Sequence, residues 1–439
     1  MRTVRVSFPQ APLQGVAPYV PGSKSLTNRL FVIGALHPPF QIINPSTAGD
    51  SRVFLQFLKQ AGYQINGLPS HRNPAAAVEI GSYTRPTHGV LRIQLEHAGT
   101  GARFLTALAS CLPGSFVFSG SKRLNQRPLK PLLDALLAAG ANISYPDEGN
   151  FPLRITGNPQ WRPPQLELDS AASSQFLSAV LLLAGHLHRG TILHETSAAT
   201  PSEPYTAMTL GLLRRLGIVW EEQTPNTWHL SSSTPEKRSY RVETDWSNVS
   251  YWLALLALTG GDILLQGLEQ DSLQGDSQQL QFWQQLGLSF FWHPKGLVAE
   301  APTTTLLPPM NFDFRAMPDL APTFFALAIF SSGTSVFQGL GTLPRKESNR
   351  IADMAELLER FGADVEYGPD WLTLHPPKTP RLPGAPLPTH QDHRIAMSLA
   401  PLSVRLPGFE LIDPEVAIKS YPGFWREWRK LGGTAEFSG

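Results

Sequence analysis

The sequence is poor in cysteine, in charged residues and in long apolar runs, and each shortage excludes a class of protein. Cys111 is the only cysteine among 439 residues, which excludes an internal disulfide framework and a cysteine-built zinc site. Charged residues make up 16% and the formal net charge is +1, so no overall field attracts nucleic acid or an anionic membrane. Apolar runs such as "FLSAVLLLAG" are too short to span a bilayer, and "VRVSF" near Met1 is strand-like rather than a targeting segment. We therefore expect a cytoplasmic protein that binds any anionic ligand through local clusters of cations.

The sequence does contain a pattern that recurs six times, in which an amphipathic helical stretch and a glycine precede a strand-like run. The glycines stand where a helix C-cap needs left-handed dihedrals, and successive ones are 70 to 78 residues apart. They are Gly62, Gly140, Gly217, Gly287, Gly362 and Gly432. Such punctuation also accumulates in unrelated α/β proteins, but the near-constant spacing favours true repeats. The period is too long for a solenoid and suits a βαβαββ unit, so three units per half predict two similar α/β domains.

The domain boundary is expected between the third and fourth repeats. The stretch "SSSTPEKRSYRVETDW", residues 231 to 246, gathers Ser, Thr, Pro and charges without an apolar period. The strand before "PGSK" can belong with the second half. We therefore predict one discontinuous domain of residues 1–20 plus 241–439, and a second domain of residues 21–240.

The stretch "PGSKSLTNR" predicts an anion site at a helix entrance. Pro21 and Gly22 form a turn, Ser23 or Ser25 can cap the helix, and the first backbone N–H groups point outward. Lys24 and Arg29 add full positive charges there. The upstream glycine of a nucleotide-binding P-loop, GxxxxGK[ST], is absent, which argues against a kinase-type site.

Cations recur at turns that flank predicted helices, and two acids lie beside them. The segments are "AGTGAR" (98–103), "NQRPLKPLLDAL" (125–136), "PRKESNRIADM" (344–354), "QDHRIAM" (391–397) and "EVAIKSYPGF" (415–424), and "SSQFL" (173–177) adds hydroxyls and an amide. Convergence on one polyanionic substrate explains this better than isolated surface arginines. Asp319 and Glu347 then make a two-carboxylate acid/base scheme possible. The alternatives are a helix N-cap for Asp319 and a surface ion pair with Arg350 for Glu347.

These residues carry a resemblance to a known family. "PGSKSLTNR", "AGT", "QRP", "SSQFL", "LQGD", "PD", "RKESNRI", "QDHRIAM" and "IKSYPGFW" resemble, in this order, the motifs of the 5-enolpyruvylshikimate-3-phosphate synthase family. The resemblance implies two inverse α/β domains, each of three βαβαββ units, with the active site in the interdomain cleft. It also implies transfer of the enolpyruvyl group of phosphoenolpyruvate to the 5-hydroxyl of shikimate 3-phosphate, with loss of phosphate and without a metal or organic cofactor.

The resemblance further implies a role for individual residues. Lys24 matches a lysine that contacts both substrates, and Lys346 matches another substrate lysine. Asp319 matches the general base, and Glu347 matches the acid that moves a proton at C3. Shikimate 3-phosphate is expected at Ser25, Arg29, Ser173, Ser174, Gln175 and Ser202, and phosphoenolpyruvate at Gly99, Arg127, Arg350, Arg394 and Lys419.

Three positions depart from the family pattern. His97 replaces the usual Asn before "AGT", Phe104 replaces a frequent proline, and Gly49-Asp50-Ser51 replaces an Asp-Asp pair. The departures fall on the phosphoenolpyruvate side of the site, which the inhibitor glyphosate also occupies.

Other interpretations remain at this point. The related UDP-N-acetylglucosamine enolpyruvyl transferase usually relies on a loop cysteine, whereas Cys111 shares a helical face with Phe104 and Leu108 and is expected to be buried. A non-catalytic phosphosugar-binding protein would need neither Asp319 nor Glu347. An RNA-phosphate-processing relative would need a basic face interleaved with aromatics, and none is evident. We expect small-molecule substrates, no nucleic-acid or membrane partner, and a monomer.

Overall fold

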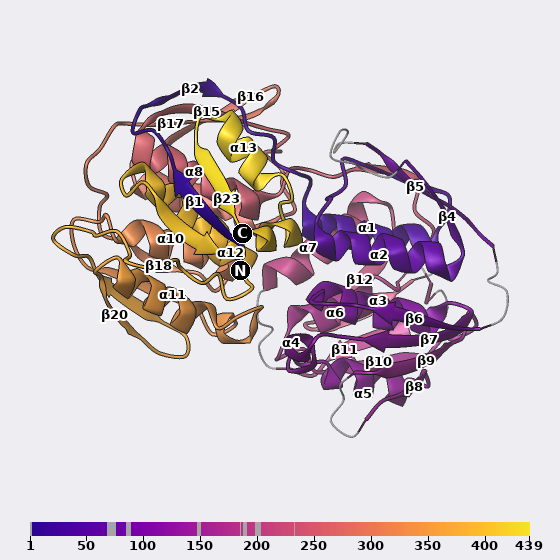
Figure 1. Cartoon of the computed structure of the whole chain (residues 1–439). Coiled ribbons are helices and arrows are strands. Elements are labelled where there is room, and N and C mark those ends of the chain that lie inside the picture. The colour runs from indigo at the N-terminus through magenta and orange to yellow at the C-terminus, as the bar shows by residue number, and fades with distance from the viewer. Residues whose placement is uncertain are drawn as a thin grey trace. The chain divides into compact units, whose positions relative to one another are not determined.

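The computed structural model describes residues 2–67, 76–84, 89–146, 151–184, 186–187, 191–197, 203–231 and 233–439. Contacts divide the chain into two compact units (Figure 1). The terminal unit comprises Met1–Pro21 and Glu243–Gly439, and the middle unit comprises Gly22–Val242. In the described part of the chain, no helix has both the length and the apolar character needed to cross a membrane.

The middle unit contains three four-stranded sheets. Their strand orders are β14-β3-β5-β4, β6-β7-β9-β8 and β10-β11-β13-β12. The strands are β3 (Phe40–Ile43), β4 (Tyr63–Asn66), β5 (Val78–Tyr83), β6 (Val90–Gln94), β7 (Gly114–Ser119), β8 (Asn142–Ser144), β9 (Leu153–Gly157), β10 (Gln165–Leu168), β11 (Thr191–Glu195), β12 (Trp220–Thr224), β13 (Thr227–Leu230) and β14 (Ser239–Arg241). The helices are α1 (Lys24–Leu36), α2 (Gly49–Ala61), α3 (Gly99–Cys111), α4 (Lys122–Asn125), α5 (Lys130–Ala138), α6 (Ser174–Leu181) and α7 (Glu203–Arg215).

The terminal unit repeats this arrangement. Its sheets have the orders β16-β17-β15-β2, β18-β19-β21-β20 and β22-β1-β23. The strands are β1 (Thr3–Ser7), β2 (Leu13–Val16), β15 (Gly261–Gln266), β16 (Ser289–His293), β17 (Gly296–Ala301), β18 (Asn311–Asp313), β19 (Ser335–Gln338), β20 (Asp364–Tyr367), β21 (Leu372–His375), β22 (Phe409–Ile412) and β23 (Thr434–Ser438). The helices are α8 (Trp246–Thr259), α9 (Leu280–Gln285), α10 (Ala321–Ala328), α11 (Arg350–Arg360), α12 (His393–Leu399) and α13 (Phe424–Lys430), with 3₁₀ turns η1 (Gly275–Gln279), η2 (Pro318–Leu320), η3 (Leu343–Arg345), η4 (Ala400–Val404) and η5 (Pro414–Lys419).

All six sheets follow one pairing rule. In β6-β7-β9-β8, for example, the first two strands are parallel and the remaining pairs are antiparallel. In the β22-β1-β23 sheet, a parallel bridge between Leu387 and Leu411 stands in for the first strand. The six predicted glycines all have positive φ values, between 78° and 105°, and each lies between a helix and a strand. The predicted α/β fold with six repeats is confirmed.

Distant segments complete several of the repeats. Strand β1 pairs on both sides, with β22 and with β23, so the indigo N-terminal strand lies beside the yellow C-terminal one (Figure 1). Strand β14 pairs with β3, and β2 pairs with β15. The start of the chain is therefore an integral part of the terminal unit rather than an appendage.

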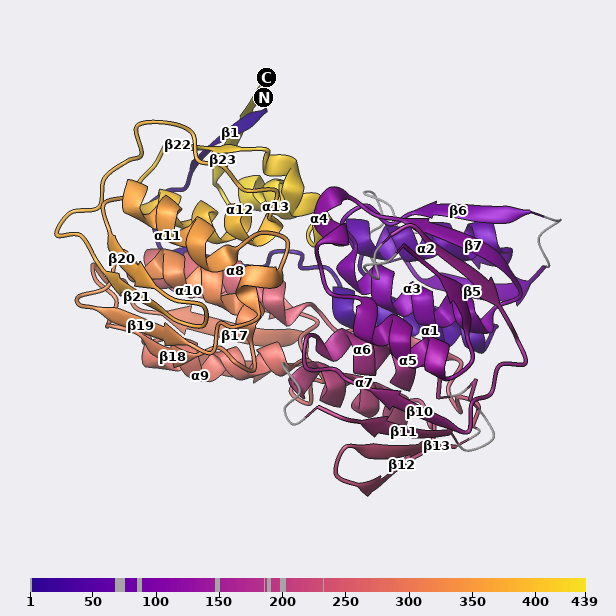
Figure 2. The ribbon, with the colours of Figure 1, turned by 90° about the horizontal axis from the view of Figure 1, so that it is seen from below.

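In each unit taken by itself, the sheets lie outside and helices fill the interior (Figure 2). Helix α10 packs against α8 and α12, and every residue of these three helices is buried. Helix α3 packs against α1 and α6 in the same way. Helices that are apolar all round belong inside a core, whereas α11 has one buried and one exposed face. The starts of these inner helices carry most of the predicted site residues.

Candidate functional site

Charged residues of the terminal unit gather at the starts of three helices. Asp319 lies in η2, immediately before α10, Arg350 is the first residue of α11, and Arg394 is the second residue of α12. The side chain of Asn349 accepts a hydrogen bond from Ala352 N and caps α11, and Asp392 caps α12 by accepting from Arg394 N. Helix N-termini carry partial positive charge, which adds to that of the cations. Two cations of the cluster lie instead at the ends of 3₁₀ turns, since Lys419 is the last residue of η5 and Lys346 directly follows η3.

Arg350 is the centre of this cluster. Its guanidinium donates from Nη1 to Asp319 Oδ1 at 2.8 Å, from Nη2 to Glu347 Oε2 at 2.8 Å, and from Nε to Asp392 Oδ2 at 2.7 Å. The side chain is only 1% exposed. Burial would lower the pKa of Arg350, but Asp392, Glu347 and Asp319 outweigh burial and raise it. Arg350 therefore stays charged and holds three carboxylates in fixed positions.

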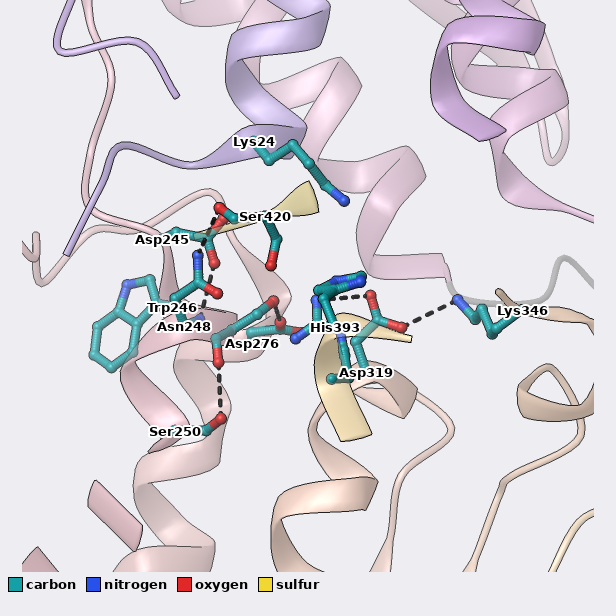
Figure 3. A network of polar contacts seen from close by, with 12 residues as sticks. Lys24, Asp245, Trp246, Asn248, Ser250, Asp276, Asp319, Lys346, His393 and Ser420 are labelled. Atoms are coloured by element: carbon teal, nitrogen blue, oxygen red, sulfur yellow. Dashed lines mark hydrogen bonds and ion pairs between the residues drawn. The ribbon is translucent and has the colours of Figure 1, made fainter. Parts of the chain in front are cut away.

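Asp319 lies among three cations. Its Oδ1 is 2.8 Å from Arg350 Nη1 and 3.3 Å from Lys346 Nζ, and its Oδ2 accepts from Arg394 Nη2 at 3.1 Å. Figure 3 shows the carboxylate between Lys346 and the start of α12, where His393 is labelled. Burial alone would raise the pKa of Asp319, but Arg394, Lys346 and Arg350 hold it well below its usual value. The N-cap interpretation is wrong, because the N-cap residue of α10 is Leu320 and its first turn has no side-chain cap hydrogen bond.

Glu347 joins two cations. Its Oε2 accepts from Arg350 Nη2 at 2.8 Å, and its Oε1 accepts from Lys419 Nζ at 2.9 Å. The predicted pair with Arg350 at i+3 therefore forms, but it is not a surface pair, since the Glu347 side chain is 12% exposed and that of Arg350 is 1% exposed. All five predicted charged residues of this unit that flank Arg350 thus belong to one cluster: Asp319, Lys346, Glu347, Arg394 and Lys419.

Sequence reasoning missed Asp392, which stands inside the quoted "QDHRIAM" segment. Its side chain is fully buried and accepts from Arg350 Nε at 2.7 Å and from Arg350 Nη2 at 3.2 Å. It also accepts from Ser348 Oγ at 3.3 Å. The signal in the sequence was the N-cap pattern of an Asp directly before a helix whose second residue is an arginine. The buried Asp392 carboxylate therefore orients the Arg350 guanidinium.

A second layer of buried polar groups lies at the start of α8 (Figure 3). Asp245 caps this helix by accepting from Asn248 N, and Ser247 Oγ donates to Asp276. Burial raises the pKa of Asp276 to about 6. Arg394 Nη1 donates to the Tyr251 hydroxyl at 3.3 Å, so α8 also helps to place the Arg394 guanidinium.

In the middle unit, Lys24 is the first residue of α1 and forms an ion pair with Asp50. Its Nζ lies 3.3 Å from Asp50 Oδ2. The N-cap is Ser23, whose hydroxyl accepts from Leu26 N, and Ser25 is half-buried in the first turn. Asp50 is a residue at one of the departures from the family pattern, and the structure places it beside the predicted substrate lysine.

Arg29 is buried in the interior of the middle unit. It donates from Nε to Thr209 Oγ1 at 2.8 Å, from Nη1 to Ser25 O at 3.0 Å, and from Nη2 to Ser178 Oγ at 3.1 Å and Tyr205 O at 3.0 Å. Burial lowers the pKa of Arg29 to about 10. These bonds tie α1 to α6 and α7, so the side chain has a structural role here, and its predicted role toward a ligand stays a prediction.

Five further predicted residues lie at or against the starts of α3 and α6. A Cβ added to Gly99 would lie 2.2 Å from Arg127 Nη1, so the guanidinium reaches the backbone only because this residue is glycine. Gln175 Nε2 donates to Thr100 Oγ1 at 3.4 Å, next to Gly99. Ser173 caps α6 by accepting from Gln175 N, and Ser174 is buried in its first turn. Ser202 lies outside the described residues.

Two residues that depart from the family pattern, and the single cysteine, also have defined surroundings. His97 Nδ1 lies 2.9 Å from Ser121 Oγ. Phe104 is buried against Phe54, and the Arg29 guanidinium lies 5.4 Å from its ring centroid. Cys111 is buried, as predicted, and burial raises the pKa of its thiol. Within the described ranges, no group of three or more His, Cys, Asp or Glu residues is arranged to hold a metal ion.

Comparison with known proteins shows the family of the chain. The family model described as EPSP synthase (3-phosphoshikimate 1-carboxyvinyltransferase) matches residues 9–428. The 3-phosphoshikimate 1-carboxyvinyltransferase of Syntrophobacter fumaroxidans is 34% identical over 94% of this chain and 96% of that protein. The protein of the same name from Methanospirillum hungatei is 33% identical over 94% of each chain.

Solved structures resemble the fold over its whole length. EPSP synthase from Acinetobacter baumannii has a TM-score of 0.79 at 22% identity, with 100% of both chains covered. The enolpyruvyl transferase NikO from Streptomyces tendae has a TM-score of 0.76 at 18% identity, with 100% of this chain and 99% of that chain covered. Similarity at this identity shows the fold alone, whereas the family model and the sequence relatives show membership. The chain belongs to the EPSP synthase (3-phosphoshikimate 1-carboxyvinyltransferase) family.

Proposed function

We propose that this chain transfers the enolpyruvyl group of phosphoenolpyruvate to the 5-hydroxyl of shikimate 3-phosphate and releases phosphate. The observation that carries the proposal is the pair of carboxylates in the terminal unit, Asp319 and Glu347, each held by cations that suit an anionic substrate. Membership of the family and relatives that bear the name of this activity support it. A binding protein would not need two acids embedded among cations.

In this reaction Asp319 is the base that accepts the proton of the 5-hydroxyl. A new bond forms between that oxygen and C2 of phosphoenolpyruvate, while C3 gains a proton. The adduct then loses a proton from C3 and breaks its C2–phosphate bond, which regenerates the enol ether and releases phosphate. Asp319 is ionised well below neutral pH, so it is ready to accept a proton, but the surrounding cations make it a weak base. Bound substrate anions cancel part of the cations' field and strengthen the base.

Glu347 and Lys24 are the residues proposed to handle the proton at C3, with Glu347 as the principal candidate. Phosphoenolpyruvate is assigned to Arg350, Arg394 and Lys419 in the terminal unit, and Lys346 is assigned as a further substrate lysine. Arginine suits these positions because its planar fork matches carboxylate and phosphate oxygens.

The middle unit supplies the other assigned residues. Gly99 and Arg127 are assigned to phosphoenolpyruvate, and Lys24 to both substrates. The helix starts that carry Ser25, Ser173, Ser174 and Gln175 are assigned to shikimate 3-phosphate, together with Arg29 and Ser202. The backbone N–H groups at the start of α3, which has no side-chain cap, support an anion at this place.

We also propose the remaining properties that the sequence predicts. These are a cytoplasmic monomer without a cofactor, without a nucleic-acid partner and without a membrane partner. The domain boundaries at residues 20/21 and 240/241 remain part of the proposal, and the division of contacts into two units supports them.

The test is phosphate release from phosphoenolpyruvate with either shikimate 3-phosphate or UDP-N-acetylglucosamine as acceptor. We expect release with shikimate 3-phosphate alone. Release with the nucleotide sugar alone would overturn the assignment. The role of Glu347 is tested in deuterated water with Glu347→Gln, which should slow the entry of solvent label into C3 of phosphoenolpyruvate. Normal label entry in this variant would make Lys24 or Lys346 the better proton donor.

A further inference from the structure

One carboxylate bridges two cations that the proposed function assigns to a substrate. Glu347 Oε1 lies 2.9 Å from Lys419 Nζ, and Glu347 Oε2 lies 2.8 Å from Arg350 Nη2. Both cations are the proposed ligands of phosphoenolpyruvate, which itself carries a carboxylate. The side chain of Glu347 thus makes the contacts that a substrate carboxylate would make with the same two residues.

The Arg350 guanidinium already contacts three carboxylates, and its side chain is only 1% exposed. Asp392 takes its inner edge, at 2.7 Å from Nε and 3.2 Å from Nη2, and the Asp392 side chain is fully buried. The outer end of the guanidinium faces Asp319 through Nη1 and Glu347 through Nη2. A substrate carboxylate that binds Arg350 in the usual paired fashion must therefore exchange with Asp319 or with Glu347.

Glu347 is the more readily displaced of these two. Asp319 contacts three cations and lies in η2, which leads directly into α10. Glu347 contacts Arg350 and Lys419, and it lies on a bend between η3 and α11, outside any helix or strand. Its side chain also has one more methylene than that of aspartate, so it can swing aside with little change in the backbone.

We propose that Glu347 is an internal competitor of the substrate carboxylate, and that phosphoenolpyruvate binds by displacing it from Arg350 and Lys419. This inference rests on the proposed function, because it takes phosphoenolpyruvate as the ligand. The exchange leaves the charge on the two cations balanced, since one carboxylate departs as another arrives. The displaced Glu347 loses two stabilising cations and becomes a better proton acceptor, which suits its proposed work at C3.

The proposal predicts that phosphoenolpyruvate binds more tightly when the bridge is removed. A ligand that competes with an internal group has an apparent affinity reduced by the fraction of time for which its site is accessible. If the bridge is formed about nine-tenths of the time, its removal tightens binding about tenfold. Gln at position 347 can accept from one cation, but its amide NH₂ is repelled by the other, so it cannot bridge them.

The experiment is calorimetric titration of the full chain with phosphoenolpyruvate in the absence of shikimate 3-phosphate. We expect Glu347→Gln to bind phosphoenolpyruvate several-fold to about tenfold more tightly than the wild type. Glu356→Gln is the matched control, because it removes the same charge from exposed Glu356 on α11, which pairs with Arg360 at 2.5 Å. The affinity of Glu356→Gln for phosphoenolpyruvate should be within about twofold of that of the wild type, because solvent ions screen the interaction between an exposed charge and a distant ligand.

Inorganic phosphate is the second probe, since it has no carboxylate. An equal gain in affinity for phosphate and for phosphoenolpyruvate in Glu347→Gln would mean a general charge effect and would overturn the proposal. Unchanged or weaker binding of phosphoenolpyruvate by this variant would also overturn it. If the glutamine variant folds poorly, Glu347→Asp replaces it. The shorter aspartate side chain cannot span both cations, so this variant should also bind phosphoenolpyruvate more tightly than the wild type. The outcome is separate from the proposed function, because tighter binding in the variant would stand even if the wild type released no phosphate, and turnover by the wild type would survive unchanged binding.

Discussion

Replacement of Gly99 by alanine tests the placement of Arg127 directly. The added Cβ would lie 2.2 Å from Arg127 Nη1, 2.6 Å from Cζ and 2.7 Å from Nη2. These atoms form the far end of a flexible side chain, so the guanidinium has to move by about 1 Å to reach ordinary contact distance, while the backbone can stay in place. A guanidinium displaced by this amount loses well-aligned hydrogen bonds to an anion.

The substitution is expected to weaken the binding of phosphoenolpyruvate. A hydrogen bond to a charged group is worth about 1.5–3 kcal/mol, which corresponds to a rise of about 10- to 150-fold in KM for this substrate. KM for shikimate 3-phosphate should change far less, because the three atoms nearest to the added Cβ all belong to Arg127 and none to a residue assigned to that substrate. Thermal stability should be unchanged or slightly higher, because alanine is a better helix former than glycine and Gly99 starts α3.

Steady-state phosphate release with each substrate varied in turn is the assay, and Gly101→Ala is the control. A Cβ at Gly101 would meet the Ala98 side chain at 3.1 Å and Phe54 at 3.8 Å, and not Arg127. A KM for phosphoenolpyruvate within about threefold of the wild type in Gly99→Ala, together with a strong rise in Arg127→Ala, would refute the proposed effect of the added Cβ. Equal rises for both substrates would also refute it, because they would point to a general distortion of the unit.

Three further predictions follow from buried groups. Asp319→Asn should lower kcat by about 10²- to 10⁴-fold with little change in the Kd of shikimate 3-phosphate, since a general base acts mainly in the transition state; a loss confined to binding would contradict this. Cys111→Ala should lower the free energy of unfolding in urea by about 1 kcal/mol and leave turnover near normal. The wild-type thiol should be alkylated only when the chain unfolds, because it is buried and its pKa is raised. Near-complete loss of activity in a folded Cys111→Ala variant would contradict a packing role for this residue. Burial raises the pKa of Glu243 to about 7, so the folded state holds a proton that the unfolded chain releases, and this contribution to stability is lost as the pH rises from about 4.5 to 7. Glu243→Gln should therefore be more stable than the wild type at pH 8, by up to roughly 3 kcal/mol, and the difference should shrink toward pH 4; a difference independent of pH would sink this explanation.

The sequence by itself determined the features that depend on local chemistry. A helix followed by glycine and a strand needs only the left-handed preference of glycine, and all six predicted glycines adopt it. The cap at Ser23 and the burial of Cys111 follow in the same way from a few neighbouring residues. The ordered motif series also identified the family, because it combines many short signals over nearly the whole chain.

Tertiary structure decided everything that depends on which distant segments meet. The insertion of β1 between β22 and β23 cannot be derived from the residues of β1, since any edge strand offers the same backbone groups. Asp319 looked equally suited to capping a helix, and only the approach of Arg350, Arg394 and Lys346 from other elements makes it a member of a charge cluster. Asp392 and the interior position of Arg29 were missed or left open for the same reason. The charge state and partners of a buried side chain depend on groups that are near in space and far apart in sequence.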